Sequence, residues 1–144
     1  MRHGDHLPMT DHAFLPAYEL ARRLRRREVS AVELPDHHLA RIARLGWHVQ
    51  LHVMDDQGRA PLAEMEPTLR ELPTDVVIDH MGSLRPGDGV GQPGFQALLR
   101  LVNTGRCWVK LSCGYRMSAL PPPYEDMVPY VQALLAARAE GLGV

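Results

Sequence analysis

The stretch Asp79-His80-Met81-Gly82 places a carboxylate and an imidazole where an apolar run, residues 76–78, gives way to a long Gly/Pro-rich segment. A short apolar run bounded by loop signals predicts a buried strand. Ionisable side chains are rarely buried without partners, so a strand that ends in Asp and His is costly unless those groups are used. In many α/β enzymes, catalytic side chains lie at strand ends. We therefore interpret His80 as the candidate catalytic residue; the alternative is an imidazole that caps the strand and contacts water.

Polar side chains also gather on one face of two further predicted strands. Residues 47–54 alternate between apolar and polar side chains, which is the period of a strand. Gln50 and His52 lie on its polar face, and Lys110 and Ser112 share one face of the strand predicted over residues 107–112. Gln50 and His52, near the end of their strand, are therefore candidate contacts for a bound molecule.

Strands and helices alternate from residue 47 onward, which predicts an α/β fold. Strands are expected over residues 47–54, 74–79 and 107–112, helices over 61–72, 95–103 and 124–138, and loops over 81–94 and 114–123. This order predicts parallel strands, in either an open doubly wound sheet or part of a (β/α)8 barrel. The polar strand faces favour the barrel, because helices cover both faces of a doubly wound sheet. The sequence also lacks the glycine motifs that bind phosphate in doubly wound sheets.

The first 45 residues have a different pattern. We expect a disordered tail over residues 1–13 and a helical segment over 14–45, followed by an incomplete barrel segment of about three βα units over 46–144. The first helix is expected over residues 14–27, and Ser30 and Glu33 form a capping-box pattern that predicts the start of a second helix. The first helix carries a cluster of arginines: Arg22, Arg23, Arg25, Arg26 and Arg27. Without interleaved aromatic residues, this cluster indicates a solvated helix face rather than a nucleic-acid site.

Composition and charge argue against several classes of protein. The 144 residues carry a net charge of −1, so neither nucleic acid nor a membrane surface is expected as a partner. No apolar run approaches the roughly 18 residues of a membrane span, and the N-terminus has no signal-peptide core. Cys107 and Cys113 lie at opposite ends of one predicted strand, about 20 Å apart, so they cannot bridge each other. These features predict a cytoplasmic protein with reduced thiols. Cys113 is interpreted as a structural thiol, because no histidine partner can be assigned to it.

Several stretches occur in an order and spacing that resemble the amidohydrolase-related family, in particular its 2-pyrone-4,6-dicarboxylate hydrolases and similar lactonases. The matching stretches are residues 42–51, 72–82, 95–101, 108–113, 115–118 and 124–130. The resemblance implies a (β/α)8 barrel that hydrolyses C–O or C–N bonds, with a carboxylated lactone or related ring as the substrate. By position it makes His80 the catalytic residue and places Arg116 near the substrate carboxylate. Gln50, His52 and Ser112 are the further expected substrate contacts.

The chemistry of these side chains agrees with the resemblance. An imidazole can donate a hydrogen bond to a carbonyl oxygen that becomes negatively charged, or it can bind a metal. A guanidinium can bind a carboxylate through two hydrogen bonds. The cofactor stays open between one divalent ion, zinc or manganese, held by His80 among others, and none.

Two motifs of the family have no counterpart, and one stretch resembles a different family. His3, His6 and His12 lack the spacing of the family's H-x-H pair, and the G-T-D pattern that supplies the aspartate base is missing. Residues 17–34 resemble the opening helices of amidase-signature enzymes. We therefore expect a truncated or fused reading frame that is inactive alone, since three βα units cannot close an eight-stranded barrel.

Three interpretations remain. The chain is an enzyme only when another chain supplies the missing strands, or it is a non-catalytic binding or assembly fragment, or it is a gene product without a function of its own. Open sheet edges would favour self-association.

Overall fold

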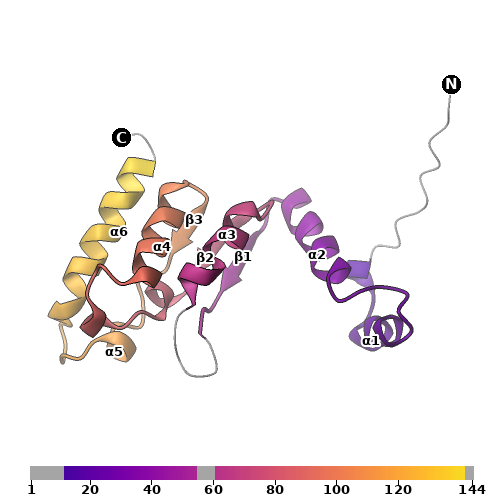
Figure 1. The fold of residues 1–144 in the computed structure, drawn as a ribbon, viewed down its shortest axis with the longest axis horizontal. Helices are drawn as coiled ribbons and strands as arrows, with labels where there is room; N and C mark the ends of the chain where they lie inside the picture. Colours follow the sequence, from indigo (N-terminus) through magenta and orange to yellow (C-terminus); the bar gives the residue numbers. More distant parts are fainter. Residues whose placement is uncertain (1–11, 55–60, 142–144) are drawn as a thin grey trace. The chain divides into compact units, whose positions relative to one another are not determined.

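The computed structural model describes residues 12–54 and 61–141, and Figure 1 shows their helices and strands. Contacts within the chain define two compact units, Met1–Gly46 and Trp47–Val144. Of the tail expected over residues 1–13, only His12 and Ala13 are described; they belong to the short 3₁₀ helix η1 (His12–Phe14), and His3 and His6 lie outside the described residues.

The second unit contains three short strands, each followed by helical segments. The elements in chain order are β1 (His48–Leu51), α3 (Leu62–Glu71), β2 (Asp75–Ile78), η2 (His80–Ser83), η3 (Pro86–Asp88), α4 (Pro93–Asn103), β3 (Cys107–Val109), α5 (Gly114–Met117), η4 (Glu125–Met127) and α6 (Val128–Gly141). The strands are parallel in the order β1-β2-β3, which confirms the expected parallel sheet. No helix among the described residues has the length and apolar character needed to cross a membrane.

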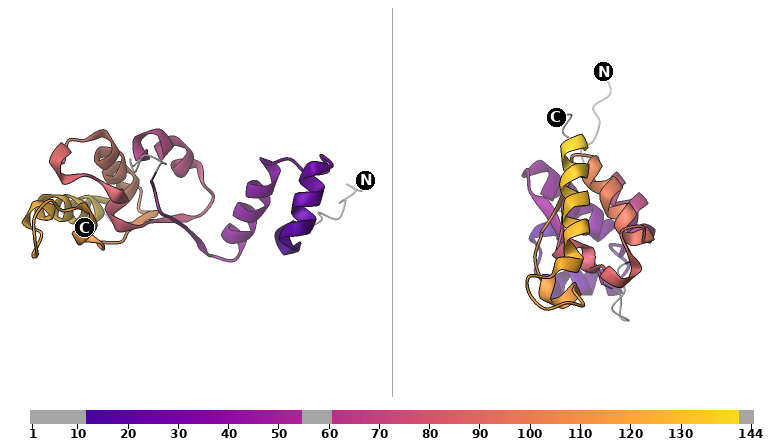
Figure 2. Two further views of the ribbon diagram at one scale, coloured as in Figure 1. Left: turned by 90° about the horizontal axis from the view of Figure 1, so that it is seen from below. Right: turned by 90° about the vertical axis from the view of Figure 1, so that its left-hand side faces the viewer.

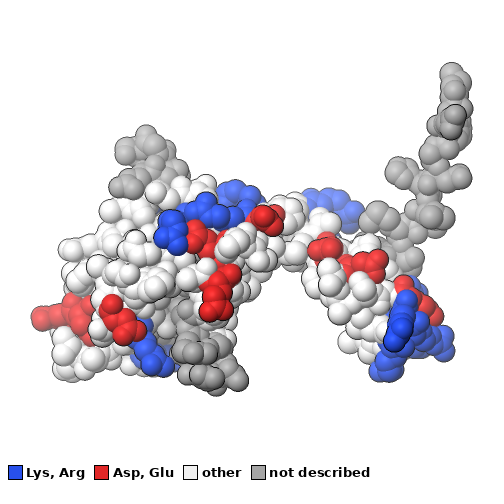
Figure 3. All heavy atoms as spheres, viewed as in Figure 1, with Lys and Arg blue, Asp and Glu red and all other residues white. Residues whose placement is uncertain are grey.

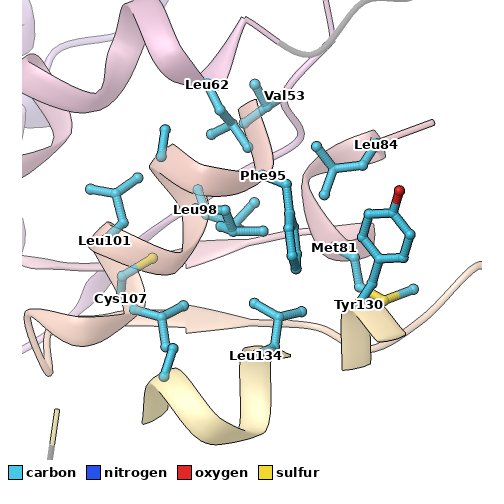
Figure 4. Close-up of a cluster of buried hydrophobic side chains, with 14 of the residues drawn as sticks. Val53, Leu62, Met81, Leu84, Phe95, Leu98, Leu101, Cys107, Tyr130 and Leu134 are labelled. Atoms are coloured by element: carbon cyan, nitrogen blue, oxygen red, sulfur yellow. The ribbon is translucent and has the colours of Figure 1, made fainter. Parts of the chain in front are cut away.

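Helices pack against one face of this sheet, where the hydrophobic core forms. Leu62 of α3, Ile78 of β2 and Phe95 and Leu98 of α4 are completely buried. Figure 4 shows the cluster that they form with neighbouring side chains, and α4 and α6 lie side by side in Figure 2. The ring of Tyr130 on α6 meets the Phe95 ring edge to face, with the centroids 4.8 Å apart. Burying these side chains fixes the helices against the sheet, because apolar burial is the main force that stabilises a core.

The other face of the sheet is more open. Gln50 of β1 pairs in register with Val77 of β2, and Val77 pairs with Trp108 of β3. Gln50 and Trp108 are exposed and Val77 is half-buried, whereas the alternate residues Val76, Ile78 and Cys107 are buried on the helix-covered face. The polar face predicted for residues 47–54 is therefore the face that the helices leave open.

The first unit consists of η1, α1 (Ala17–Arg25) and α2 (Glu33–Arg44). The capping box is present: the Glu33 N–H donates to Ser30 Oγ at 3.0 Å, and the Ser30 N–H donates to Glu33 Oε2 at 2.8 Å. Arginine side chains gather on α1 (Figure 3), and both Arg22 and Arg23 pair with Glu19. Within the described part of this unit, neither α-helix has a buried side chain, and Val29 between them is buried.

Candidate functional site

The turn that follows β2 is built from residues in left-handed backbone. His80, Met81, Gly82 and Ser83 have φ values of 52°, 49°, 73° and 54°. This conformation is unfavourable for residues with a Cβ and persists only where the surroundings fix it. Here Met81 and Gly82 are buried, and the Met81 N–H donates to the Lys110 carbonyl oxygen at 3.1 Å. The turn therefore places His80 at the C-terminal edge of the sheet.

A polar network connects the ends of the three strands just before this turn. Gln50 Nε2 donates to both carboxylate oxygens of Asp79, at 3.1 and 2.9 Å. Lys110 Nζ lies 3.0 Å from Asp79 Oδ1. The hydrogen bond from Gln50, followed by that from Lys110, holds the pKa of Asp79 below its ordinary value. Asp79 is therefore an anchored anion, and its contact with Lys110 was missed by the sequence reasoning even though alternation placed Lys110 on the same face as Ser112.

His80 lies between side chains from the two neighbouring strand ends. Its Nδ1 is 2.9 Å from Ser112 Oγ, and its ring meets the His52 ring edge to face with centroids 5.2 Å apart. His52 Nε2 lies 3.1 Å from the sulfur of Met54. Of the residues that the sequence nominated, the structure thus gathers His80, His52 and Ser112, while the Gln50 side chain binds Asp79 instead.

A cavity of about 220 Å³ opens beside His80. It is lined by Met54, His80, Ser83, Leu84, Arg85, Cys113, Arg116 and Met117. His80 and Arg116 therefore share one cavity, whereas Gln50, His52 and Ser112 are not among its lining residues. Arg85, a second guanidinium here, was missed by the sequence reasoning, since no periodic pattern marks a single arginine in a Gly/Pro-rich loop.

Cys113 differs from its interpretation as a structural thiol without a histidine partner. Its Sγ lies 3.9 Å from His80 Nε2, and the side chain is only partly buried. The partner was missed because His80 follows the neighbouring strand, 33 residues earlier in the chain. Cys107, in contrast, is buried, and this burial raises the pKa of its thiol to about 11.

The group His52, Asp79 and His80 has the composition of a metal site, with potential ligand atoms within 4.8 Å of one another. Its hydrogen bonds do not fit a resident divalent cation. Both Asp79 oxygens already accept hydrogen bonds from Gln50, and the Lys110 ammonium would lie beside the ion. A cation bound to Asp79 would be repelled by this ammonium, because both carry positive charge and both would contact the same carboxylate. These side chains are therefore better described as a hydrogen-bonded site.

Comparison with known proteins identifies the family. The model of the amidohydrolase family matches residues 8–141. The chain belongs to this family. The match includes residues 17–34, the stretch that resembles amidase-signature enzymes, and this second resemblance stays a prediction.

Two curated relatives of this family member are named as hydrolases of small ring compounds. A 4-sulfomuconolactone hydrolase from Hydrogenophaga intermedia is 37% identical over 91 residues, which are 63% of this chain and 29% of that protein. A 2-pyrone-4,6-dicarboxylate hydrolase from Comamonas testosteroni is 33% identical over 104 residues, 66% of this chain and 33% of that protein. The chain thus spans about a third of the length of these relatives.

Two crystal structures of proteins provisionally assigned as 2-pyrone-4,6-dicarboxylic acid hydrolases are also similar. The protein from Pseudomonas putida is 36% identical with a TM-score of 0.53, over 73% of this chain and 36% of that chain. The protein from Acinetobacter baumannii, solved with citric acid bound, is 31% identical with a TM-score of 0.55, over 77% of this chain and 40% of that chain. The parallel sheet and its helices are therefore an amidohydrolase-type arrangement.

Proposed function

We propose that the cavity beside His80 binds the carboxylate of a lactone ring and forms part of a lactone-hydrolase site. The observation that carries the proposal is the shared cavity of His80, Arg85 and Arg116, which joins an imidazole to two cationic side chains. The relatives named as hydrolases of small ring compounds support the same class of substrate.

Each side chain then has a specific role in the proposed reaction. Arg116, with Arg85 beside it, binds the substrate carboxylate, since guanidinium groups match carboxylate geometry. The His80 imidazole donates a hydrogen bond to the lactone carbonyl oxygen and stabilises the negative charge that develops there. Ser112 fixes the orientation of the imidazole, and the anchored Asp79 holds the ends of the strands together.

Attack by water also needs a general base. Within the described part of the chain, no carboxylate lines the cavity. We propose that the base comes from another segment and that this chain alone binds the ring without hydrolysing it efficiently.

The proposed site agrees with the larger architecture that we propose for this region. The β1, β2 and β3 strands with α3 and α4 are consecutive units of a (β/α)8 barrel, whose interior is the face that carries Gln50, Val77 and Trp108. The parallel order, the helices on one face and the more open second face support this placement.

Calorimetric titration with 2-pyrone-4,6-dicarboxylate and with citrate tests the proposal on the full chain. Arg116→Gln is expected to weaken binding roughly 10- to 100-fold, because a hydrogen bond to a charged group contributes about 1.5–3 kcal/mol. Arg25→Gln, at the end of α1, is the matched control and should bind as the unmodified chain does. Equal affinities of both variants for both ligands would contradict the assignment of Arg116.

An assembly role is the second candidate, and β3 is the observation that favours it. Trp108, Leu111 and Leu135 are 52%, 49% and 60% exposed along β3 and the neighbouring surface of α6. We propose a second copy of this chain as the partner that covers this edge.

A further inference from the structure

The thiol of Cys113 belongs to an arrangement that lactone hydrolysis does not use. Its Sγ lies 3.9 Å from His80 Nε2 and 3.9 Å from Tyr115 Oη. When His80 Nδ1 carries the ring proton and donates to Ser112 Oγ, Nε2 presents its lone pair toward the thiol. A nucleophile, a base and a group that orients the base are therefore adjacent, which is the general pattern of an activated nucleophile.

The backbone and the cavity add two independent observations. Cys113 has a φ of 61°, so the residue that joins β3 to α5 is held in left-handed backbone, like the turn that carries His80. Arg85 and Arg116 line the cavity that Cys113 also lines. Two guanidinium groups raise the local concentration of anionic reagents at the thiol.

We propose that Cys113 is a covalent modification site for small carboxylated electrophiles, which Arg116 and Arg85 hold by the carboxylate. The inference concerns the cavity of the proposed hydrolase site, but it does not require that the chain hydrolyse a lactone. The class of ligand includes α-halocarboxylates and α,β-unsaturated carboxylates.

The reaction needs no oxidant or reductant. With iodoacetate, the thiol proton passes to His80 Nε2, sulfur forms a bond to the methylene carbon, and the carbon–iodine bond breaks as iodide leaves with its electron pair. With an unsaturated carboxylate, sulfur adds to the carbon–carbon double bond, and the imidazolium returns the proton to the carbon next to the carboxylate.

The test compares an anionic and a neutral reagent of the same reactivity class on the full chain. Rates of alkylation by iodoacetate and iodoacetamide are measured by intact mass, with peptide mapping to assign the site, and 2-mercaptoethanol serves as the reference thiol. The ratio of the iodoacetate rate to the iodoacetamide rate at Cys113 should exceed the reference ratio about tenfold. Arg116→Gln should bring the ratio back near the reference; a general change in the reactivity of the thiol would alter both rates together and leave the ratio as it is.

Two further measurements keep the outcome decisive. Cys113→Ser should abolish labelling, and the buried Cys107 should stay unlabelled in the folded chain. If Arg116→Gln does not fold, added salt in the unmodified chain should lower the ratio, because salt screens the attraction between the reagent and the guanidinium groups. A ratio equal to that of 2-mercaptoethanol, or labelling of Cys107 at the rate of Cys113, would overturn the proposal. Failure to hydrolyse lactones would leave it unaffected.

Discussion

Gly82 is the residue at which the site and the core constrain each other. Its φ is +73°, and a Cβ built there would lie 2.5 Å from Leu62 Cδ1 and 3.5 Å from Leu98 Cδ2. Leu62 and Leu98 are completely buried, so neither can move aside without disturbing the core. The turn that carries His80 can therefore pack this closely only because residue 82 has no side chain.

Gly82→Ala is expected to destabilise the fold by about 2 kcal/mol or more, from overpacking together with left-handed strain. Gly87→Ala is the control, because nothing lies within 4 Å of a Cβ at that position and its φ is not in the left-handed range. The midpoint of urea unfolding, followed by circular dichroism, measures both. A Gly82→Ala midpoint equal to that of Gly87→Ala would show that the turn is not fixed by the core.

At the same scale, the sequence predicted which residues belong to the site better than it predicted the side chains that each of them contacts. His80 could be found because an acid and a histidine end an apolar run, and Arg116 because the family resemblance supplied its position. The Cys113–His80 contact could not be found, since it depends on two neighbouring strands ending at the same level. Nor does the sequence show that Gln50 binds Asp79 rather than a ligand, because both arrangements use the same polar strand face.

At the scale of elements, one carboxylate connects α3 and α4. Glu66 on α3 accepts hydrogen bonds from Arg100 on α4, the shortest at 2.6 Å, and from Arg70 one turn along its own helix at 3.1 Å. The Glu66 side chain is only 12% exposed. The Arg100 guanidinium, with help from Arg70, holds the pKa of Glu66 below its ordinary value of 4.5.

This lowered pKa gives the α3–α4 contact a predictable dependence on pH. Because the folded pKa lies below the unfolded one, Glu66 stabilises the fold above about pH 4.5, and this stabilisation is lost as the pH falls toward the folded pKa. Glu66→Gln should therefore lower the melting temperature most near neutral pH, and the difference from the unmodified chain should shrink below pH 4.5. Melting curves across this range test it, with the exposed Glu71→Gln as control. A difference that is independent of pH would contradict the assigned ion pair.

Most elements agree with the expected order, but their ends do not. The strands expected over residues 47–54 and 107–112 shorten to β1 (His48–Leu51) and β3 (Cys107–Val109). In β1, the alternation of side chains continues beyond the residues that pair with β2, so the pattern overestimates the length of the strand. β3 ends where the chain turns toward Cys113, which has left-handed backbone. Helix α5 (Gly114–Met117) lies where Gly and Pro predicted only a loop. Helix α4 starts at Pro93, two residues before the expected start, because proline is compatible with the first turn of a helix.

For the whole molecule, the main consequence is the open edge of β3 within the described sheet. The Val76 N–H of β2 donates to the Arg106 carbonyl oxygen, and the Lys110 N–H donates to the Ile78 carbonyl oxygen of β2. The main-chain groups of Arg106 and Lys110, on either side of β3, therefore face β2. Since main-chain groups alternate sides in a parallel strand, those of Cys107 and Val109 face the open edge. Such an edge is a template for pairing with another chain.

We expect the full chain to self-associate through this edge in a concentration-dependent way. Leu135→Glu, on the exposed surface of α6 beside Trp108, should shift sedimentation toward the monomer, because it places a charge in the apolar contact. Val90→Glu changes another exposed apolar residue, in the loop before α4, and is the control. Identical sedimentation of the two variants across a concentration series would argue against the β3 edge as the interface.

The left-handed run from His80 to Ser83 also sets stability against function at two positions. Glycine and asparagine adopt this backbone more readily than histidine or serine, so selection for stability alone would favour them at positions 80 and 83. The chain has His80 and Ser83 there, and both line the cavity. These two side chains therefore cost the fold stability, as is common where a strained turn serves a site.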